Sequence, residues 1–226
     1  WFESLDEVKG SDGHAAPFGG SIPLERAMSD RDSLPGALLA TRMNERLLPA
    51  DHGYPVRAAV PGFIGARSVK WLGRIVVSDR PSPNHYLADA YKIVMSSDAE
   101  ELKKADPIYE FPINSAICVP SADEKVKPGR LTVRGYALAP GQKGRTIDEI
   151  QVSADGGTTW VKAARTSPSR EFCWQLWEAD IEVGPQTKSL MARALDSAGA
   201  LQPETTPWNA KGYLQNSWHR VPVQGS

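Results

Sequence analysis

Two patterns of hydrophobic and polar residues follow one another along the chain, and the change falls near Asp98. Before this point the apolar residues come in short, irregular runs separated by glycines and prolines. Three of these runs have the length and composition of strands, namely Leu38–Met43, Arg57–Val60 and Val69–Val77, the last with a break at Gly73. The first part of the chain is therefore predicted to mix short elements.

One helix is expected in this first part. Ser21–Met28 has a serine at its start, Pro23 in what would be the first turn and Glu25 near the N-terminal end. These residue types favour a helix N-terminus with Ser21 as the N-cap. Ala88–Met95 is too short for its pattern to distinguish helix from strand.

Beyond Asp98 a charged link, DAEELKKADP, leads into segments in which apolar and polar residues alternate. This alternation is typical of strands with one buried face. The predicted strands are Leu131–Leu138, Glu149–Ser153, Thr159–Ala164, Phe172–Ile181, Leu190–Leu195 and Trp218–Val223. The Ala-Asp-Gly-Gly sequence between the second and third favours a hairpin, and 196–199 favours another tight turn. Short strands at this spacing predict a β-sandwich.

Tryptophans within the predicted sandwich indicate which faces are buried. Trp174 and Trp177 lie three positions apart in one strand, so they face opposite sides and at least one belongs to the core. Trp160 follows the hairpin turn, as a core residue of a sandwich often does, and Tyr136 is placed against a core. The seven tryptophans also leave open a carbohydrate-binding or adhesion sandwich, which the buried tryptophans disfavour.

Composition sets wide limits. The 226 residues include 26 basic and 27 acidic ones, so the chain lacks the excess of positive charge that would indicate a nucleic-acid partner. The sequence contains no run of 18 apolar residues, which a membrane-spanning helix would need. The first residues, WFESLDEVKG, do not have the pattern of a signal peptide. A mature or truncated chain would also lack such a peptide. Cys118 and Cys173 could pair or bind metal, but their apolar neighbours favour buried free thiols.

The stretch from His52 to Arg74 is rich in cations and contains no carboxylate. Basic residues among glycines, prolines and apolar residues suit a half-buried anion, because arginine and lysine give charge-assisted hydrogen bonds to phosphate oxygens. Two other interpretations stay open: the cations could be solvated surface, or carboxylates elsewhere in the chain could neutralise them.

At this point the motifs become specific. DHGYPVR at Asp51–Arg57 and VPGFIGARSVKWLGRI at Val60–Ile75 resemble the molybdenum-cofactor domain of the sulfite oxidase family. FESLD, FGGSIPLERAM and MNERLLPADHG agree in order and spacing. Further along, NSAICVP, VRGYALA, VSADGGTTWV, WQLWE and PWNAKGYLQNSWHRV resemble the dimerisation domain of that family. The resemblance covers nearly the whole chain.

The resemblance implies an α+β architecture in two parts. Residues 1–98 would be the C-terminal part of a mixed α/β cofactor domain that binds the molybdenum cofactor (Mo-molybdopterin). Residues 99–226 would be an immunoglobulin-like β-sandwich that forms a homodimer. Family members hold molybdenum through a cysteine expected upstream of Trp1, so we expect no metal ligand in this chain and no redox activity from it without the N-terminal half of the enzyme.

The resemblance also assigns site residues. The positions that match cofactor contacts of the family are Asp6, His52, Arg57, Ser68, Val69 and Lys70, although some members have histidine in place of Ser68. Tyr91 matches the active-site tyrosine, and Lys211 stands where animal sulfite oxidases bind sulfite with an arginine. Without the family, Tyr91 would be read as a core residue and Lys211 as an exposed one. Lysine keeps the charge but lacks the planar fork of arginine.

The implied reaction is oxygen-atom transfer that converts sulfite to sulfate, with electrons passing to a haem domain or a c-type cytochrome. No haem-attachment CxxCH motif occurs in the sequence, so that acceptor would be another domain or protein. Alternatives that remain open are another oxyanion or a sulfoxide as substrate, and a module that serves only dimerisation. The compartment stays unknown, and the family implies the periplasm if the source is bacterial.

Overall fold

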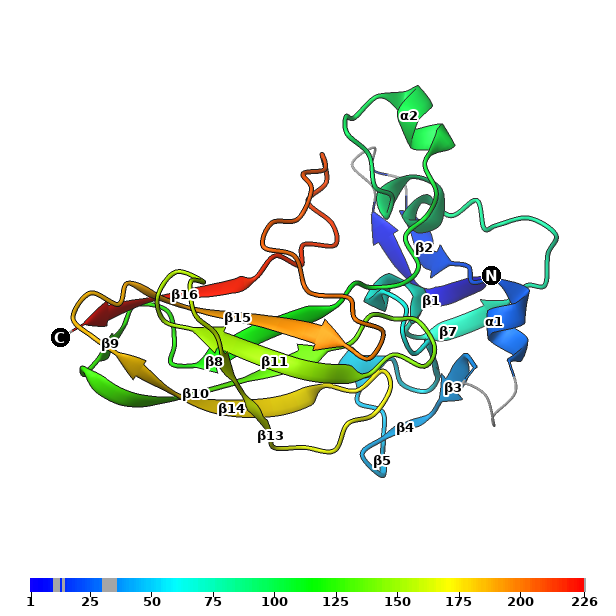
Figure 1. Cartoon of the computed structure of the whole chain (residues 1–226). Coiled ribbons are helices and arrows are strands. Elements are labelled where there is room, and N and C mark those ends of the chain that lie inside the picture. Colours follow the sequence, from blue (N-terminus) through cyan, green and yellow to red (C-terminus); the bar gives the residue numbers. More distant parts are fainter. Residues whose placement is uncertain (10–12, 14, 30–35, 226) are drawn as a thin grey trace. The chain divides into compact units, whose positions relative to one another are not determined.

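The computed structural model of the chain describes residues 1–9, 13, 15–29 and 36–225, and these form two compact units. The first unit comprises Trp1–Phe111 together with Trp208–Tyr213, and the second comprises Pro112–Pro207 together with Leu214–Ser226. Strands outnumber helices in both (Figure 1). The boundary expected after residue 98 lies instead between Phe111 and Pro112.

The displaced boundary has a physical reason. Residues that follow Asp98 remain bound to the first unit through long-range backbone pairing. Lys92 forms a bridge with Pro107, and Phe63 forms one with Glu110. The polar link therefore ends the first unit rather than separating the two.

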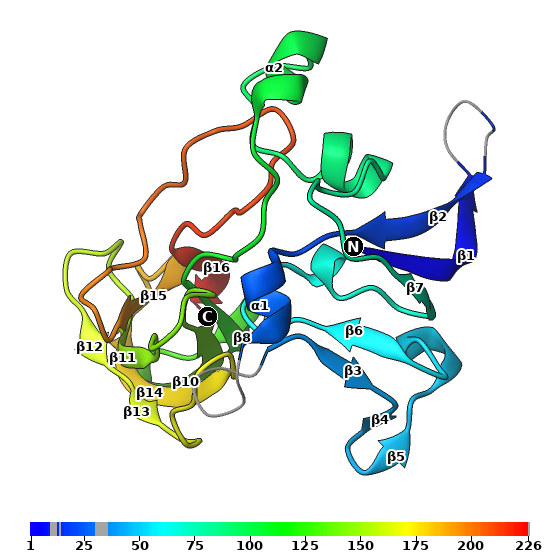
Figure 2. The ribbon, with the colours of Figure 1, turned by 90° about the vertical axis from the view of Figure 1, so that its right-hand side faces the viewer.

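The first unit is built from short strands and helical turns. Its strands are β1 (Phe2–Lys9), β2 (Ala15–Gly20), β3 (Leu38–Ala40), β4 (Arg42–Met43), β5 (Arg46–Leu47), β6 (Arg57–Ala59) and β7 (Leu72–Ile75). Its helices are α1 (Leu24–Met28), α2 (Ala99–Lys104), the 3-10 turns η1 (Ala50–His52) and η2 (Gly65–Arg67), and the π-turn η3 (Tyr86–Ala90). Figure 2 shows β2, β1 and β7 side by side as one sheet, and β3 pairs with β6 in another.

Several local predictions for this unit were wrong. The expected helix Ser21–Met28 is only α1, which begins after Pro23 without a side-chain cap. Ser21 is buried, and its hydroxyl accepts a hydrogen bond from the Ser82 N–H at 3.3 Å, so it is not free to cap a helix. The expected strand Leu38–Met43 is split into β3 and β4. Residues Ala88–Met95, whose pattern left helix and strand open, contain part of the π-turn η3.

The core of the first unit lies under the cation-rich stretch. Its buried members are Phe2, Ala58, Val60, Phe63, Val69 and Leu72. Four of these six come from residues 58–69, so the apolar part of that stretch is core while its charged side chains lie beside it. Packing against this shared core holds β6 and η2 in fixed positions.

The second unit consists of two sheets that share one core, drawn as two layers in Figure 1. Its strands are β8 (Asn114–Val119), β9 (Glu124–Val126), β10 (Gly129–Leu138), β11 (Ile147–Ser153), β12 (Val161–Lys162), β13 (Ala164–Arg165), β14 (Gln175–Val183), β15 (Ser189–Asp196) and β16 (His219–Gly225). One sheet has the order β13-β14-β10-β8, and the other has the order β12-β11-β15-β16-β9. The predicted hairpin at Ala-Asp-Gly-Gly is confirmed, since β11 pairs with β12 across it.

Trp177 is the largest side chain of this core, at 1% exposure, whereas Trp174 is 61% exposed. The prediction that the two face opposite sides is confirmed. Gly135 lies opposite Trp177 in the β10–β14 pair, and a Cβ there would come within 2.5 Å of the indole and 2.0 Å of the Ala116 carbonyl. The glycine is therefore required for the tryptophan to fit. Tyr136 points to the outer face, where it stacks on Trp174 with ring centroids 4.7 Å apart, so its predicted core position was wrong.

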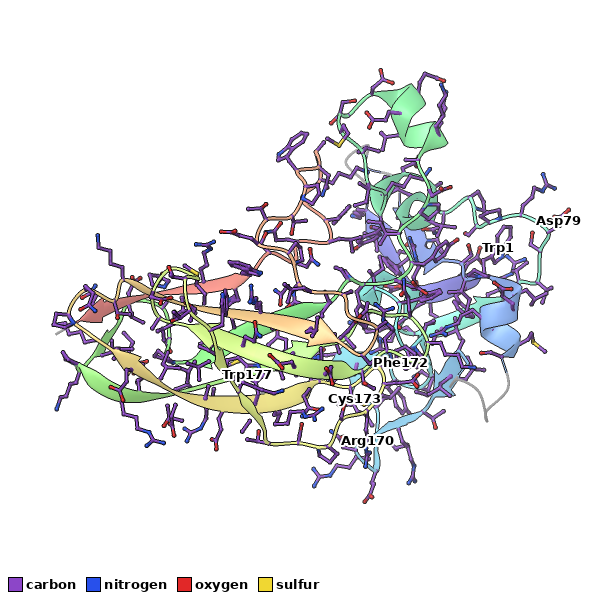
Figure 3. The ribbon with its side chains drawn as sticks, viewed as in Figure 1. Trp1, Asp79, Arg170, Phe172, Cys173 and Trp177 are labelled. Carbon is purple, nitrogen blue, oxygen red and sulfur yellow. The ribbon has the colours of Figure 1, made fainter. Side chains whose placement is uncertain are left out.

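Both cysteines are exposed free thiols, so their predicted burial was also wrong. Cys118 lies near the end of β8, where the register with β10 shifts and the following residue is exposed as well. Cys173 lies on the loop before β14, next to Phe172, while Trp177 lies within the strand (Figure 3). The apolar runs around both cysteines belong to strands whose burial begins or ends a few residues away.

Candidate functional site

A cavity of about 300 Å³ lies in the first unit beside the cation-rich stretch. Its walls come from β1, β2, β6, η2 and the residues that follow η2 and η3. The lining residues are Asp6, Phe18, Arg57, Gly65, Ala66, Ser68, Lys70, Trp71 and Tyr91. Five of the eight residues singled out from the sequence are among them, whereas His52, Val69 and Lys211 are not.

Arg57 enters the cavity wall from the start of β6. Its guanidinium donates to the carbonyls of Ser68 at 2.9 Å, Ala58 at 3.2 Å and His52 at 3.3 Å. Within the described part of the chain no carboxylate forms an ion pair with it. Burial lowers the pKa of Arg57, because the charge loses hydration without gaining a counter-charge. A desolvated cation of this kind is suited to receive an anion.

Lys70 supplies the second cation of the wall. Its ammonium donates to the carbonyl of Asp51 at 2.8 Å and lies 4.5 Å from the centre of the Trp71 ring. Gly53 packs against the Lys70 backbone with a φ of +100°, and a Cβ there would approach the Lys70 Cβ to 2.8 Å. Glycine at position 53 therefore lets η1 fold against residues 70–71.

Asp6 contributes the opposite charge to the same wall. Its Oδ1 is buried and has no hydrogen-bond partner among the described residues. A buried acceptor without a donor is costly, so a ligand with N–H groups would satisfy it. Gly65 lines the cavity too, and a Cβ added there would meet no protein atom within 4 Å, which leaves this part of the wall open.

Ser68 and Val69 contribute mainly through the backbone. The Ser68 hydroxyl accepts from the Val60 N–H at 3.0 Å, and its carbonyl accepts from Arg57. Val69 is completely buried in the core, and its carbonyl accepts from the Ala58 N–H at 2.8 Å. Its side chain therefore anchors the wall and does not reach the cavity.

His52 ends η1 and has an exposed side chain. Only its backbone takes part in the wall, since its carbonyl accepts the Arg57 hydrogen bond. The imidazole is not among the groups that line the cavity.

Tyr91 follows the π-turn η3 and is one of the residues that line the cavity. The Tyr91 carbonyl accepts from the Ile108 N–H at 2.8 Å, which fixes its backbone. Lys211 donates from its ammonium to the carbonyls of Asp89 and Ala90, the latter at 2.8 Å, just before Tyr91. Burial is the largest cause that lowers the pKa of Lys211; Asp89 opposes this and Lys92 adds to it. The structure thus brings Lys211 close to Tyr91 in space and gives it carbonyl partners.

Arg67 is the residue that the sequence reasoning did not assign to the site. It is completely buried in η2, and its guanidinium donates to the carbonyls of Ile108 at 2.9 Å and Tyr86 at 3.2 Å. It also lies 5.8 Å from the centre of the Tyr91 ring, and burial lowers its pKa. The sequence could have indicated its burial, because Arg67 lies within a stretch whose apolar residues form the core.

The described residues include no cluster of three or more His, Cys, Asp or Glu side chains that could hold a metal ion. In the same part of the chain, every helix is too short or too polar to cross a bilayer.

The residues that line the cavity can bind an organic anion through Arg57 and Lys70, accept hydrogen bonds from N–H donors through Asp6, and offer the phenol of Tyr91. The chemistry of the donor set fits a phosphorylated pterin.

Two family models match the chain. Residues 1–86 match the oxidoreductase molybdopterin binding domain, and residues 105–226 match the Mo-co oxidoreductase dimerisation domain.

Individual relatives agree with these matches. The chain is 41% identical to the mitochondrial sulfite oxidase of Macaca fascicularis over 98% of its length, and 40% identical to the sulfite oxidase of Arabidopsis thaliana over 97%. It covers 41% and 58% of those two proteins. It is also 37% identical over 97% of its length to nitrate reductase [NADH] 1 of Phaseolus vulgaris, of which it covers 27%.

Among solved structures, the sulfane dehydrogenase SoxCD of Paracoccus pantotrophus superposes with a TM-score of 0.77 at 25% identity. The alignment covers 100% of this chain and 57% of that one. The chain therefore spans between 27% and 58% of the length of these four proteins.

Proposed function

The chain belongs to the sulfite oxidase family of molybdenum-cofactor oxidoreductases, and on that premise we propose that it is part of an enzyme that oxidises sulfite to sulfate. The observation that carries the proposal is a cavity in which, among the described residues, no carboxylate forms an ion pair with Arg57 or Lys70 and the buried Oδ1 of Asp6 has no donor. An anionic ligand with N–H groups complements all three.

The cofactor-holding residues follow from this complementarity. Arg57 and Lys70 would bind the phosphate of the molybdopterin, and Asp6 would accept from the pterin N–H groups. Ser68 and Val69, which lie next to Lys70 in the chain, would offer backbone groups to the cofactor. His52 would contact the cofactor only if its exposed imidazole turned from solvent toward the cavity, so we place it at the rim.

When bound, the molybdenum cofactor supplies the oxygen-atom transfer and accepts the two electrons of sulfite oxidation. Tyr91 lines this cavity, and a phenol hydroxyl can donate a hydrogen bond. We assign it the role of a donor to the substrate. Lys211 carries the positive charge near Tyr91 that would draw in an oxyanion. Both roles are positional: the residues orient and neutralise the substrate.

The second unit is assigned to homodimer formation through an immunoglobulin-like sandwich. Two sheets over one core and an exposed apolar outer face support this assignment. On that face Trp174 is 61%, Leu176 48% and Val119 43% exposed, and exposed apolar side chains that gather on one face are typical of an interaction surface. Sedimentation of the complete protein at several concentrations tests it, and a monomer at every concentration would contradict it.

The electron acceptor would be a haem domain or a c-type cytochrome. The decisive experiment measures molybdenum and pterin content of the complete protein and its sulfite-dependent reduction of cytochrome c. We expect stoichiometric cofactor and reduction that depends on sulfite. A protein that holds the cofactor but is oxidised by nitrate and not reduced by sulfite would assign it to the other substrate class. One without cofactor would overturn the proposal.

A further inference from the structure

A short segment, Trp208–Tyr213, returns to the first unit and packs beside η3. The ring of Tyr213 stacks on the ring of Tyr91, with centroids 5.3 Å apart and planes at 30°. Offset stacking at this distance is favourable and fixes the relative orientation of two rings. Because Tyr91 lines the cavity, Tyr213 supports a cavity-lining residue through this ring contact.

Tyr213 is itself held in place. The buried side chain of Asn209 closes the segment on itself, accepting from the Tyr213 N–H at 3.0 Å and donating to the Tyr213 carbonyl at 2.9 Å. Ala210 donates from its N–H to the Val94 carbonyl at 2.8 Å, which ties the segment to the residues after Tyr91. The ring of Tyr213 is thus presented from a fixed backbone.

Two other ring contacts of Tyr91 among the described residues are longer. The Arg67 guanidinium carbon is 5.8 Å from its centre, and the Tyr86 ring centre is 6.5 Å away. A hydrogen bond from Ile108 fixes the Tyr91 backbone but leaves its side-chain torsions free. Of the described residues with a ring contact to Tyr91, Tyr213 has the shortest centroid distance, so it is well placed to select the rotamer of Tyr91.

We infer that Tyr213 is a positioning residue, whose stacked ring holds the Tyr91 phenol in the orientation that faces the cavity. The inference rests on the function proposed above, because it concerns the same site. The aromatic ring carries the effect, so phenylalanine at position 213 retains it and an aliphatic side chain does not.

Three variants of the complete holoenzyme test this. Tyr213→Val removes the stacked ring, Tyr213→Phe keeps it, and Trp208→Val is the matched control. Trp208 is an aromatic residue of the same segment that is 67% exposed. For each variant the kcat and KM for sulfite and the melting temperature are measured. In parallel, 3-fluorotyrosine is placed at position 91, and its ¹⁹F resonance reports the ring environment without reference to turnover.

We expect Tyr213→Val to lower kcat by about 10-fold to 100-fold, the usual effect of displacing a reacting group by about an ångström. Its ¹⁹F signal should shift and broaden, while Tyr213→Phe restores both the rate and the signal. Trp208→Val should behave as the parent protein does.

A folded Tyr213→Val protein with unchanged kcat and an unchanged ¹⁹F signal would overturn the inference, and so would a Tyr213→Phe protein as impaired as the valine variant. If the valine variant melts too low to assay, Tyr213→Leu replaces it, under the same two criteria. Failure of the proposed function has a different signature, since the unaltered holoenzyme would then fail to oxidise sulfite while the ¹⁹F comparison still decides the role of Tyr213.

Discussion

The Nε of Arg67 donates a 2.9 Å hydrogen bond to the carbonyl of Ile108, a residue 41 positions further along the chain. Ile108 in turn donates from its N–H to the Tyr91 carbonyl at 2.8 Å. A buried arginine thereby connects η2 to the backbone of the residue assigned to the substrate. Its Nη2 has no partner among the described residues, so the guanidinium is retained there at an energetic cost.

We predict that Arg67→Met lowers the free energy of unfolding by about 2 to 3 kcal/mol, because two carbonyls lose charge-assisted donors in the core. Arg80→Met is the matched control: the Arg80 side chain is 85% exposed, and we expect a change within about 0.5 kcal/mol. Denaturant unfolding of both variants measures the difference. Equal stability of the two would mean that water replaces the guanidinium at Ile108 and Tyr86.

Arg57→Gln should weaken cofactor retention by roughly tenfold or more, since it removes a charge-assisted hydrogen bond of about 1.5 to 3 kcal/mol. Arg74→Gln provides the comparison, because Arg74 belongs to the same basic stretch but forms an exposed ion pair with Glu3 at 3.3 Å. Molybdenum and pterin content after dialysis is the measurement. Equal losses in the two variants would argue against a phosphate at Arg57.

Lys211→Met should raise the KM for sulfite by about tenfold, and Lys211→Arg should recover most of it, because the anion needs the positive charge near Tyr91. Steady-state kinetics at two ionic strengths check this, since screening weakens the effect of the charge in the parent enzyme. If Lys211→Met changes kcat and stability but leaves KM alone, Lys211 serves only to bind the carbonyls at the end of η3.

Stability should fall as the pH drops below about 6.5, partly through His219. Burial lowers the pKa of His219, and its Nδ1 accepts from the Ile117 N–H at 3.1 Å, so the folded state favours the neutral ring. A base with a depressed pKa binds fewer protons folded than unfolded, so its contribution is present above the ordinary histidine value and is lost as the pH falls.

Denaturant midpoints between pH 8 and pH 5 test this against His219→Asn, which keeps an acceptor but does not titrate. The variant should show the smaller decline over this range. Parallel curves for the two proteins would remove His219 as the cause.

Much of the second unit could be predicted from the sequence because its longest strands, β10 and β14, alternate between buried and more exposed residues. In β10 the inward Val133, Gly135 and Ala137 alternate with exposed or half-buried residues, as period-2 reasoning requires. The first unit was harder for a reason visible in β1. In β1 the polar Ser4 is buried on the same face as Phe2, whereas the apolar Leu5 is 71% exposed, so residue type does not reveal which face is buried. The register against β2 also shifts between Glu3 and Glu7.

The site divides in the same way. Residue types and motif order were enough to identify the chemistry: the stretch from His52 to Arg74, its cations without carboxylates, and the family. The folded chain was needed to show that Val69 is core, that the buried Arg67 lies 5.8 Å from the Tyr91 ring, and that Tyr213 stacks on Tyr91. Periodicity and residue type report on a few neighbouring positions, whereas contacts between distant segments depend on how the whole unit closes around its core.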